Sequence, residues 1–342
     1  MKLKRKINYF LKYIFFHPHR IVNLIKINIS RSLKLPKIIG LPHTVMIEPT
    51  NTCNLKCPLC PTGAGLIKRA KGFLKFEDFK KVVDETYKSV FHIRLWNWGE
   101  PLLNKEIFRM IAYAKRKKIF VNLSTNSSFL DQTISEKIVN SGLDELIVSL
   151  DGASEKAYTA YRKGGDFNKV INSIKFLTRE RKRLNKKTPF IKLQFIIMKS
   201  NENEISKMKS LAKTLGVDEL SFKTVGIMDY FSKEDIKKYI PSQKKYSRYA
   251  VDSNKVLSKR GVKNWCDFIW DEMVINWDGS VVPCCFDMNN RYPFGNVFNQ
   301  SVKEVWNSNK YVQFRKQILS SKKQIPLCKY CPGTNKQTFV NI

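Results

Sequence analysis

Short β-prone segments alternate with amphipathic helical segments between residues 42 and 235. The β-prone segments are rich in β-branched and aromatic residues, as is typical of strands. Between them, apolar residues recur at the three- and four-residue spacing of a helix that buries one face. The predicted strands are 44–48, 92–96, 119–123, 145–149, 191–198 and 219–222, and the predicted helices are 76–90, 105–117, 134–140, 169–183 and 204–215.

This alternation favours a parallel sheet, because parallel neighbours need a crossover connection and a helix usually supplies it. Right-handed crossovers curl such a sheet toward a barrel. Six β/α units are fewer than the eight that close a (β/α)8 barrel. We therefore predict an α/β fold whose main part is a partial (β/α)6 TIM-like barrel.

The first 40 residues have a different pattern, with ten Lys or Arg and no acidic residue. Apolar residues repeat at helical spacing on both sides of Pro18, which predicts a basic amphipathic helical extension too short to span a bilayer. Two interpretations stay open: the extension lies on an anionic membrane surface, or its apolar stripe packs onto the following domain. The repeating residues are Leu3, Ile7, Phe10, Leu11, Ile14, Ile21, Ile25 and Ile29.

The pattern changes again near residue 264. Residues 273–277 and 280–282 flank Asp278-Gly279, which predicts a hairpin with a type I′ turn. Five of the eight cysteines follow residue 265, so a small, metal-stapled α+β domain is expected here. The predicted organisation is an extension at 1–40, the barrel at 41–235, a basic linker or helix at 236–263, and a cluster-binding domain at 264–342.

The net charge is +33, from 62 Lys and Arg against 29 Asp and Glu. This charge predicts anionic partners but does not choose among nucleic acid, an acidic membrane and an acidic substrate. The cysteines fall in three groups, with none from Pro61 to Trp265. No cleavable signal sequence is recognised, and disulfide stapling belongs mostly to short secreted chains. The cysteines therefore predict metal or cluster ligands in a cytoplasmic protein.

Three cysteines, Cys53, Cys57 and Cys60, follow the first predicted strand with Cys-x3-Cys-x2-Cys spacing. Three thiolates on one loop can hold three irons of a [4Fe–4S] cluster and leave the fourth iron open. A structural zinc site needs four closed ligands, and no fourth Cys or His lies nearby in the sequence. The loop therefore favours an iron–sulfur cluster.

Polar motifs follow the next predicted strands. Gly99-Glu100-Pro101 comes after the second, Ser124-Thr125-Asn126 after the third, and Ser149-Leu150-Asp151-Gly152 after the fourth. Each motif alone is typical of a turn or a helix cap. Together they fall at the carboxyl ends of the strands, where β/α barrels build their active sites.

With these motifs the chain resembles the radical S-adenosylmethionine (SAM) superfamily, in particular members with a C-terminal SPASM or shorter twitch domain. The resemblance implies that the cysteine loop holds a [4Fe–4S] cluster whose open iron binds the amino and carboxylate groups of SAM. One electron then cleaves SAM to a 5′-deoxyadenosyl radical, which abstracts a hydrogen atom from the substrate. It also implies SAM contacts from Gly99, Glu100, Ser124, Asn126, Ser149 and Arg162.

The later cysteines resemble the auxiliary-cluster pattern of the same family. Cys266, Gly279 and Cys284 are separated by twelve and four residues, and Cys328 and Cys331 by two. The resemblance implies one auxiliary [4Fe–4S] cluster, which transfers electrons, on Cys266, Cys284, Cys328 and Cys331, with Cys285 spare. From the residues alone, a four-cysteine zinc ribbon is the alternative.

The main hypothesis is a radical SAM oxidoreductase that acts on a small-molecule, sugar or lipid-linked substrate. The alternative is a peptide- or protein-modifying SPASM maturase. A zinc-stabilised RNA-binding protein is a distant third, since it does not explain a loop with three ligands. An acidic electron donor such as flavodoxin or ferredoxin is the expected partner, with peripheral contact to the inner face of an anionic membrane and no nucleic acid. No catalytic base is assigned.

Overall fold

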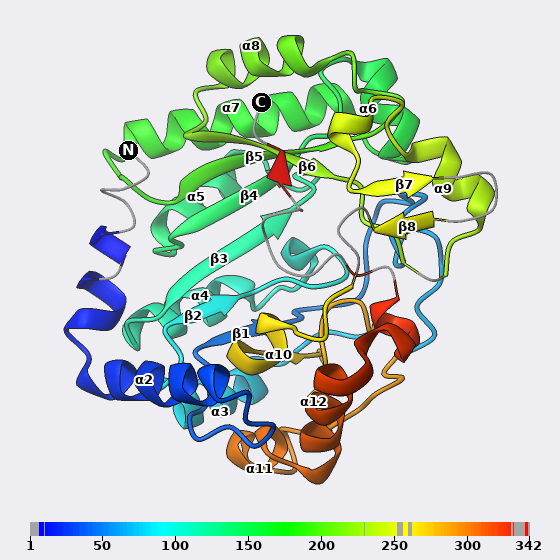
Figure 1. Ribbon diagram of the computed structural model, residues 1–342. Helices are drawn as coiled ribbons and strands as arrows, with labels where there is room; N and C mark the ends of the chain where they lie inside the picture. Colours follow the sequence, from blue (N-terminus) through cyan, green and yellow to red (C-terminus); the bar gives the residue numbers. More distant parts are fainter. Residues whose placement is uncertain are drawn as a thin grey trace.

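A computed structural model of the chain describes residues 7–9, 11–228, 230–251, 256–258, 262–329, 331 and 339–340. The main sheet has the strand order β11-β10-β9-β1-β2-β3-β4-β5-β6-β12 (Figure 1). Its central strands β1 to β6 are parallel neighbours in chain order, and the sheet does not close. The partial barrel is therefore confirmed. These strands are β1 (Thr44–Ile47), β2 (His92–Arg94), β3 (Phe120–Thr125), β4 (Glu145–Ser149), β5 (Phe190–Ile197) and β6 (Glu219–Thr224).

Helices connect the parallel strands and cover one face of the sheet (Figure 1). Five of them match the predicted helices to within a few residues, because each has a strong apolar stripe. The short α6 was not predicted, since seven residues are too few to show a helical period. The crossover helices are α3 (Phe76–Thr86), α4 (Ile107–Arg116), α5 (Gln132–Asn140), α6 (Glu155–Tyr161), α7 (Phe167–Arg183) and α8 (Ile205–Leu215).

The two faces of the sheet have different side chains. Val121 and Leu123 belong to the main core, which also contains residues of the covering helices. Because side chains alternate along a strand, Ser124 on β3 lies on the opposite face, which we call the lumen. The same alternation places Ser149 of β4 and Lys223 of β6 on the lumen face.

The C-terminal segment extends the same sheet rather than forming a separate one. Strand β9 (Glu272–Ile275) pairs in parallel with β1, and β10 (Ser280–Val282) and β11 (Gly295–Asn296) follow in antiparallel order. At the other edge, β12 (Phe339–Val340) pairs with β6. Three helices, α10 (Asp267–Asp271), α11 (Val302–Trp306) and α12 (Asn309–Ser321), accompany these strands.

The predicted hairpin forms, but the predicted type I′ turn is wrong. That turn needs positive φ at both central residues, whereas Gly279 has φ +81° and Asp278 is not among the residues with positive φ. Asn276 pairs with Ser280, and the Gly279 N–H donates to the Asn276 carbonyl at 2.9 Å. The connection is thus a three-residue loop with glycine in the left-handed position.

The segment predicted as a linker is partly structured. Helix α9 (Lys233–Tyr239) and a short 3-10 turn (Lys244–Tyr246) precede two paired strands, β7 (Tyr249–Val251) and β8 (Val256–Ser258). The four-part division of the chain stays a prediction.

The N-terminal extension lies across the amino ends of the central strands. It comprises a short π-helix, η1 (Leu11–Phe15), and α2 (Pro18–Ser32), with Pro18 in the first turn of α2. Ile14 is buried beside Phe91, just ahead of β2, whereas Ile25 and Ile29 are exposed. Leu3 and Phe10 lie outside the described residues. No helix in the described ranges is both long enough and apolar enough to traverse a bilayer.

Candidate active site

The cysteine loop leaves the carboxyl end of β1 with N–H groups directed at its sulfurs. The backbone N–H of Leu55 lies 3.4 Å from Cys53 Sγ, and Asn126 Nδ2 lies 3.6 Å from the same sulfur. Arg162 Nη1 lies 3.9 Å from Cys57 Sγ. Donors of this kind stabilise thiolates and tune the potential of a cluster that they hold.

Burial controls the protonation of these thiols. It raises the pKa of Cys53 to about 11, and it raises the pKa of Cys57 against the opposing effect of Arg162. Both thiols are therefore protonated at neutral pH, and a metal centre must displace the protons on binding. Burial thus disfavours free, nucleophilic thiolates in this loop.

The donor set fits an iron–sulfur cluster, because Cys53, Cys57 and Cys60 offer three thiols that can each bind a different iron of one cube. Gly63 lies against the loop: a Cβ at this position would lie 2.4 Å from the backbone nitrogen of Cys57. Only a glycine there lets the segment after Cys60 pack so closely on the backbone of Cys57.

Gly99 allows the segment after β2 to lie against the loop that carries the cysteines. It has φ +85°, and a Cβ here would lie 2.4 Å from the carbonyl oxygen of Thr50 and 2.7 Å from that of Thr52. The N–H of Glu100 donates to the Thr52 carbonyl at 2.8 Å. Only glycine combines this backbone conformation with this close approach.

Glu100 is buried, and its carboxylate joins β2 to the end of β3. It accepts hydrogen bonds from Thr125 Oγ1 and the Asn126 N–H, each at 2.8 Å, and from the Leu102 N–H at 3.1 Å. Burial raises the pKa of Glu100, while these donors lower it. Leu102 belongs to a 3-10 turn, η2 (Pro101–Leu103), so Glu100 fixes the backbone on both sides of the site. Its contact with SAM stays a prediction.

Asn126 links this carboxylate to the cysteine loop. Its N–H binds Glu100, and its Nδ2 donates to Asn54 Oδ1 at 2.9 Å in addition to Cys53 Sγ. Ser124 and Ser149 lie on the lumen face of the neighbouring strands β3 and β4. The structure therefore brings all six predicted SAM-contacting residues to the carboxyl ends of β2, β3 and β4 and to the end of α6.

Asp151 is a site residue that the sequence analysis did not select. It is fully buried and pairs with Arg162, with its Oδ2 2.7 Å from Nε and 2.5 Å from Nη2. Its Oδ1 accepts a hydrogen bond from the Ile196 N–H at 2.6 Å. The pair fixes Arg162 beside Cys57. The signal in the sequence was a carboxylate directly after the fourth strand, eleven residues ahead of that arginine.

The C-terminal cysteines gather at one end of the added strands. Cys266 precedes α10, Cys284 follows β10, and Cys328 ends the 3-10 turn η5 (Pro326–Cys328). Burial raises the pKa of Cys266 to about 11 and that of Cys328 to about 12, and in both cases the negative potential of Cys331 contributes further. Burial raises the pKa of Cys284, and the negative potentials of Cys285, Cys328 and Cys331 raise it further. These four thiols and Cys285 are thus close enough to influence one another.

Cys285 differs from these four in its surroundings. It packs with Met46, Val274 and Trp96 in the lumen, whereas Cys284 packs against the main core. The spare role of Cys285 stays a prediction.

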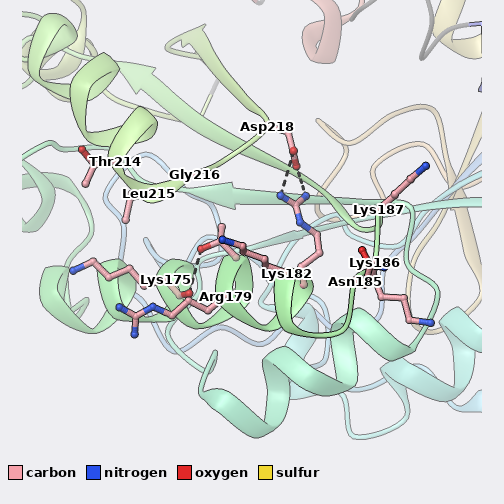
Figure 2. A pocket seen from close by; sticks show the side chains of 12 residues that line it. Lys175, Arg179, Lys182, Asn185, Lys186, Lys187, Thr214, Leu215, Gly216 and Asp218 are labelled. Carbon is pink, nitrogen blue, oxygen red and sulfur yellow. Dashed lines mark hydrogen bonds and ion pairs between the residues drawn. The ribbon is translucent and has the colours of Figure 1, made fainter.

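A separate open hollow of about 880 Å³ lies between α7 and α8 (Figure 2). It is lined by the carboxyl ends of these helices and by the segments that lead into β5 and β6, and none of the predicted site residues lines it. Since helices end where the next strand begins, the hollow is at the opposite end of the barrel from the cysteine loop. It is not part of the candidate active site.

Family comparisons agree with the order of these features along the chain. Residues 47–212 match the family model "Radical SAM superfamily", and residues 266–332 match SPASM, "Iron-sulfur cluster-binding domain".

Among curated proteins, a tungsten-containing aldehyde ferredoxin oxidoreductase cofactor-modifying protein of Pyrococcus furiosus is 24% identical over 86% of this chain and 88% of its own length. The AdoMet-dependent heme synthase of Methanosarcina barkeri is 31% identical over 51% of this chain and 48% of its length. The PqqA peptide cyclase of Granulibacter bethesdensis is 26% identical over 51% of this chain and 45% of its own length. The chain thus spans about half the length of the last two relatives.

Solved structures have the same fold. Streptococcus suis SuiB bound to S-adenosylmethionine superposes with a TM-score of 0.66 at 16% identity, over 92% of this chain and 79% of SuiB. The structure of anSMEcpe with bound AdoMet and Cp18Cys peptide superposes with a TM-score of 0.60 at 20% identity, over 87% of this chain and 92% of anSMEcpe. The two matched regions, which together cover 233 of the 342 residues, show that the chain belongs to the radical SAM superfamily and has a C-terminal SPASM domain.

Proposed function

We propose that this protein is a radical SAM enzyme that modifies a peptide or protein by abstracting a hydrogen atom from one of its side chains. The observation that carries the proposal is the three-cysteine loop, in which two sulfurs have N–H donors nearby. Two of these donors come from other elements: Asn126 from the end of β3 and Arg162 from the end of α6. Family membership implies a [4Fe–4S] cluster, SAM and auxiliary iron–sulfur chemistry. When bound, these groups supply the electron that cleaves SAM and the carbon radical that takes the hydrogen atom.

The chain's own residues hold and orient these groups. We assign Cys53, Cys57 and Cys60 as ligands of the first cluster, and Cys266, Cys284, Cys328 and Cys331 as ligands of one auxiliary cluster. Asp151 fixes the guanidinium of Arg162, which can then pair with the carboxylate of SAM. Amide and hydroxyl groups can form hydrogen bonds with the ribose and methionine parts of SAM. Asn126, Ser124 and Ser149 provide such groups.

A peptide substrate is supported by the relatives. The relatives include the PqqA peptide cyclase and the mycofactocin maturase MftC of Mycolicibacterium smegmatis, which is 25% identical over 52% of this chain.

A cofactor-like small molecule is the second candidate. The observation that favours it is the Pyrococcus furiosus relative, because it matches most of both chains and its name describes cofactor modification. Under either candidate, an acidic flavodoxin or ferredoxin is the proposed reductant, since the chain carries a net charge of +33.

The substrate class can be tested by co-expressing the protein with the short open reading frames beside its gene. Intact-mass and fragment spectra of each peptide are then compared with those from cells that carry a Cys57→Ala variant. A mass change that requires Cys57 supports peptide modification. If no peptide changes while a small metabolite accumulates only with the active enzyme, the second candidate replaces the first.

Arg162 provides a test of the SAM-binding role. Arg162→Lys retains a positive charge but loses the planar fork, and it leaves Asp151 incompletely paired. We expect the KM for SAM to rise at least about tenfold, a loss typical of one bidentate charged contact. The measurement is 5′-deoxyadenosine formation against SAM concentration. An unchanged KM would mean that Arg162 only supports the fold.

The auxiliary cysteines can be tested by iron content. Anaerobically reconstituted protein should hold about eight irons per chain, and a Cys266→Ala/Cys284→Ala variant about four. Cys285→Ala is the matched control, because it changes a neighbouring cysteine assigned no ligand role, and it should keep the full content. Stoichiometric zinc with no loss of iron in the double variant would contradict the assignment.

A further inference from the structure

Exposed apolar side chains concentrate in the N-terminal extension. Of the twelve large apolar residues exposed in the described part of the chain, nine lie between residues 7 and 39. Single exposed apolar residues are ordinary on a protein surface, but a local concentration marks an interaction site.

Helix α2 buries several polar side chains. Arg20, Asn23 and Ser30 are buried on the face that also carries the core residue Ile27. The Arg20 guanidinium donates to the carbonyls of Tyr87 at 2.9 Å and Lys118 at 2.7 Å. The Asn23 side chain exchanges two hydrogen bonds of 2.8 Å with the backbone of Leu41. These bonds fix the rotation of the helix about its axis.

The opposite face of α2 is consequently apolar and exposed. A row of apolar side chains at three- and four-residue spacing lies on this face. Its members are Val22, which is 50% exposed, Ile25 (54%), Ile29 (44%) and Leu33 (65%). Phe16, just ahead of the helix, is 70% exposed. Turning this row inward would break the hydrogen bonds of Arg20 and Asn23, so the row needs an external partner.

The charge around the row identifies the partner's chemistry. Lys12, Lys26, Lys34 and Lys37 are exposed, and the chain has no acidic residue before Glu48. The nearest carboxylates on the adjoining α10, Asp267 and Asp271, are paired with Arg31 at 2.7 and 3.0 Å. A bilayer of anionic lipids has negative headgroups above an apolar interior. An exposed apolar row with lysines around it is complementary to such a surface in both respects.

The rest of this end of the barrel is also basic. Strands β3 and β4 point away from the side on which α2 lies (Figure 1). The crossover helices therefore end on the α2 side, and basic residues occupy the last turns of α4 and α7. The hollow of Figure 2 adds Lys175, Arg179, Lys186 and Lys187, while Asp218 in its wall is paired with Arg181.

We propose that this end of the barrel docks on an anionic phospholipid surface. The row of α2 and Phe16 enter the interface between headgroups and acyl chains, and the lysines contact lipid phosphates. The cysteine loop, at the opposite end, then faces away from the lipid and stays open to substrate and reductant. The proposal does not depend on which substrate the enzyme modifies.

The test is vesicle flotation of the full chain with its clusters, using phosphatidylcholine vesicles with or without phosphatidylglycerol. We expect binding only to the vesicles that contain phosphatidylglycerol, and loss of binding near 1 M salt, where the Debye length is about 3 Å. Ile25→Ser/Ile29→Ser should weaken binding at least about tenfold, because it removes apolar groups that enter the interface. Removing one of Lys26, Lys34 or Lys37 should weaken it about fivefold.

Phe176→Ser is the matched control. Phe176 is an exposed apolar residue on α7, outside the extension, and its replacement should leave binding unchanged. Iron content and thermal unfolding show that each variant is folded. No binding of the unaltered protein, or equal binding by the double variant, would overturn the proposal. It would also be overturned by a dimer that forms without lipid and dissociates in the double variant, since the row would then join two copies of the chain.

Discussion

Replacing Cys57 with alanine is expected to abolish the formation of 5′-deoxyadenosine from SAM. Cys57 is the most buried of the three loop cysteines, and Arg162 lies beside its sulfur. Without this thiolate the loop offers two ligands, which do not hold a site-differentiated [4Fe–4S] cluster. We expect the rate to fall more than about 10³-fold, equivalent to over about 4 kcal/mol of activation free energy.

The measurement is product formation by anaerobically reconstituted, reduced protein, with iron content measured on the same sample. Cys285→Ala is the control, because it removes a cysteine on the lumen side that is assigned no cluster. It should retain both iron and activity. Undiminished product from the Cys57 variant would remove the loop from the mechanism and with it the proposed function.

Gly99→Ala has the second largest expected effect. The new methyl group would lie 2.4 Å from the Thr50 carbonyl oxygen, at a residue with φ +85°. The strained backbone costs about 1–3 kcal/mol, and the contact adds to that cost because backbone atoms must move. The atoms that must move belong to the loop that carries Cys53. We expect weaker SAM binding by at least about 100-fold, measured by equilibrium dialysis under anaerobic conditions.

Gly216→Ala separates the two causes. Gly216 ends α8 with φ +68°, and a Cβ there would meet nothing within 4 Å. This variant carries the backbone strain without the contact, so it should lose stability but bind SAM normally. Equal loss of SAM binding in both variants would assign the effect to general destabilisation.

The parallel core and the cysteine loop could be predicted from the sequence because local signals agree there. Each central strand is a short run of β-branched or aromatic residues, and each long crossover helix has a clear apolar stripe. The three-cysteine spacing is equally local. The motifs that contain Glu100 and Asn126 stand out by their position after a strand, and the family resemblance gave these residues a role at SAM. The structure joins them through a 2.8 Å hydrogen bond.

Features that depend on distant contacts could not be predicted. The Asp151–Arg162 pair required knowledge of what lies beside Cys57. The orientation of α2 stayed open for a related reason: the apolar repeat does not say which of its residues face the protein. Hydrogen bonds from Arg20 and Asn23 to distant backbone decide the orientation. The turn at Gly279 differs because Asp278 does not adopt positive φ.

The pairing of β1 with β9 has a consequence for biosynthesis. Thr44 is the partner of Glu272, which lies 228 positions further along the chain. While the ribosome is still making the region between them, β1 has an unpaired edge that can join another chain. Non-local pairing of this kind also closes slowly. We therefore expect overproduction to favour aggregation through β1, because it raises the concentration of chains in which this edge is still unpaired.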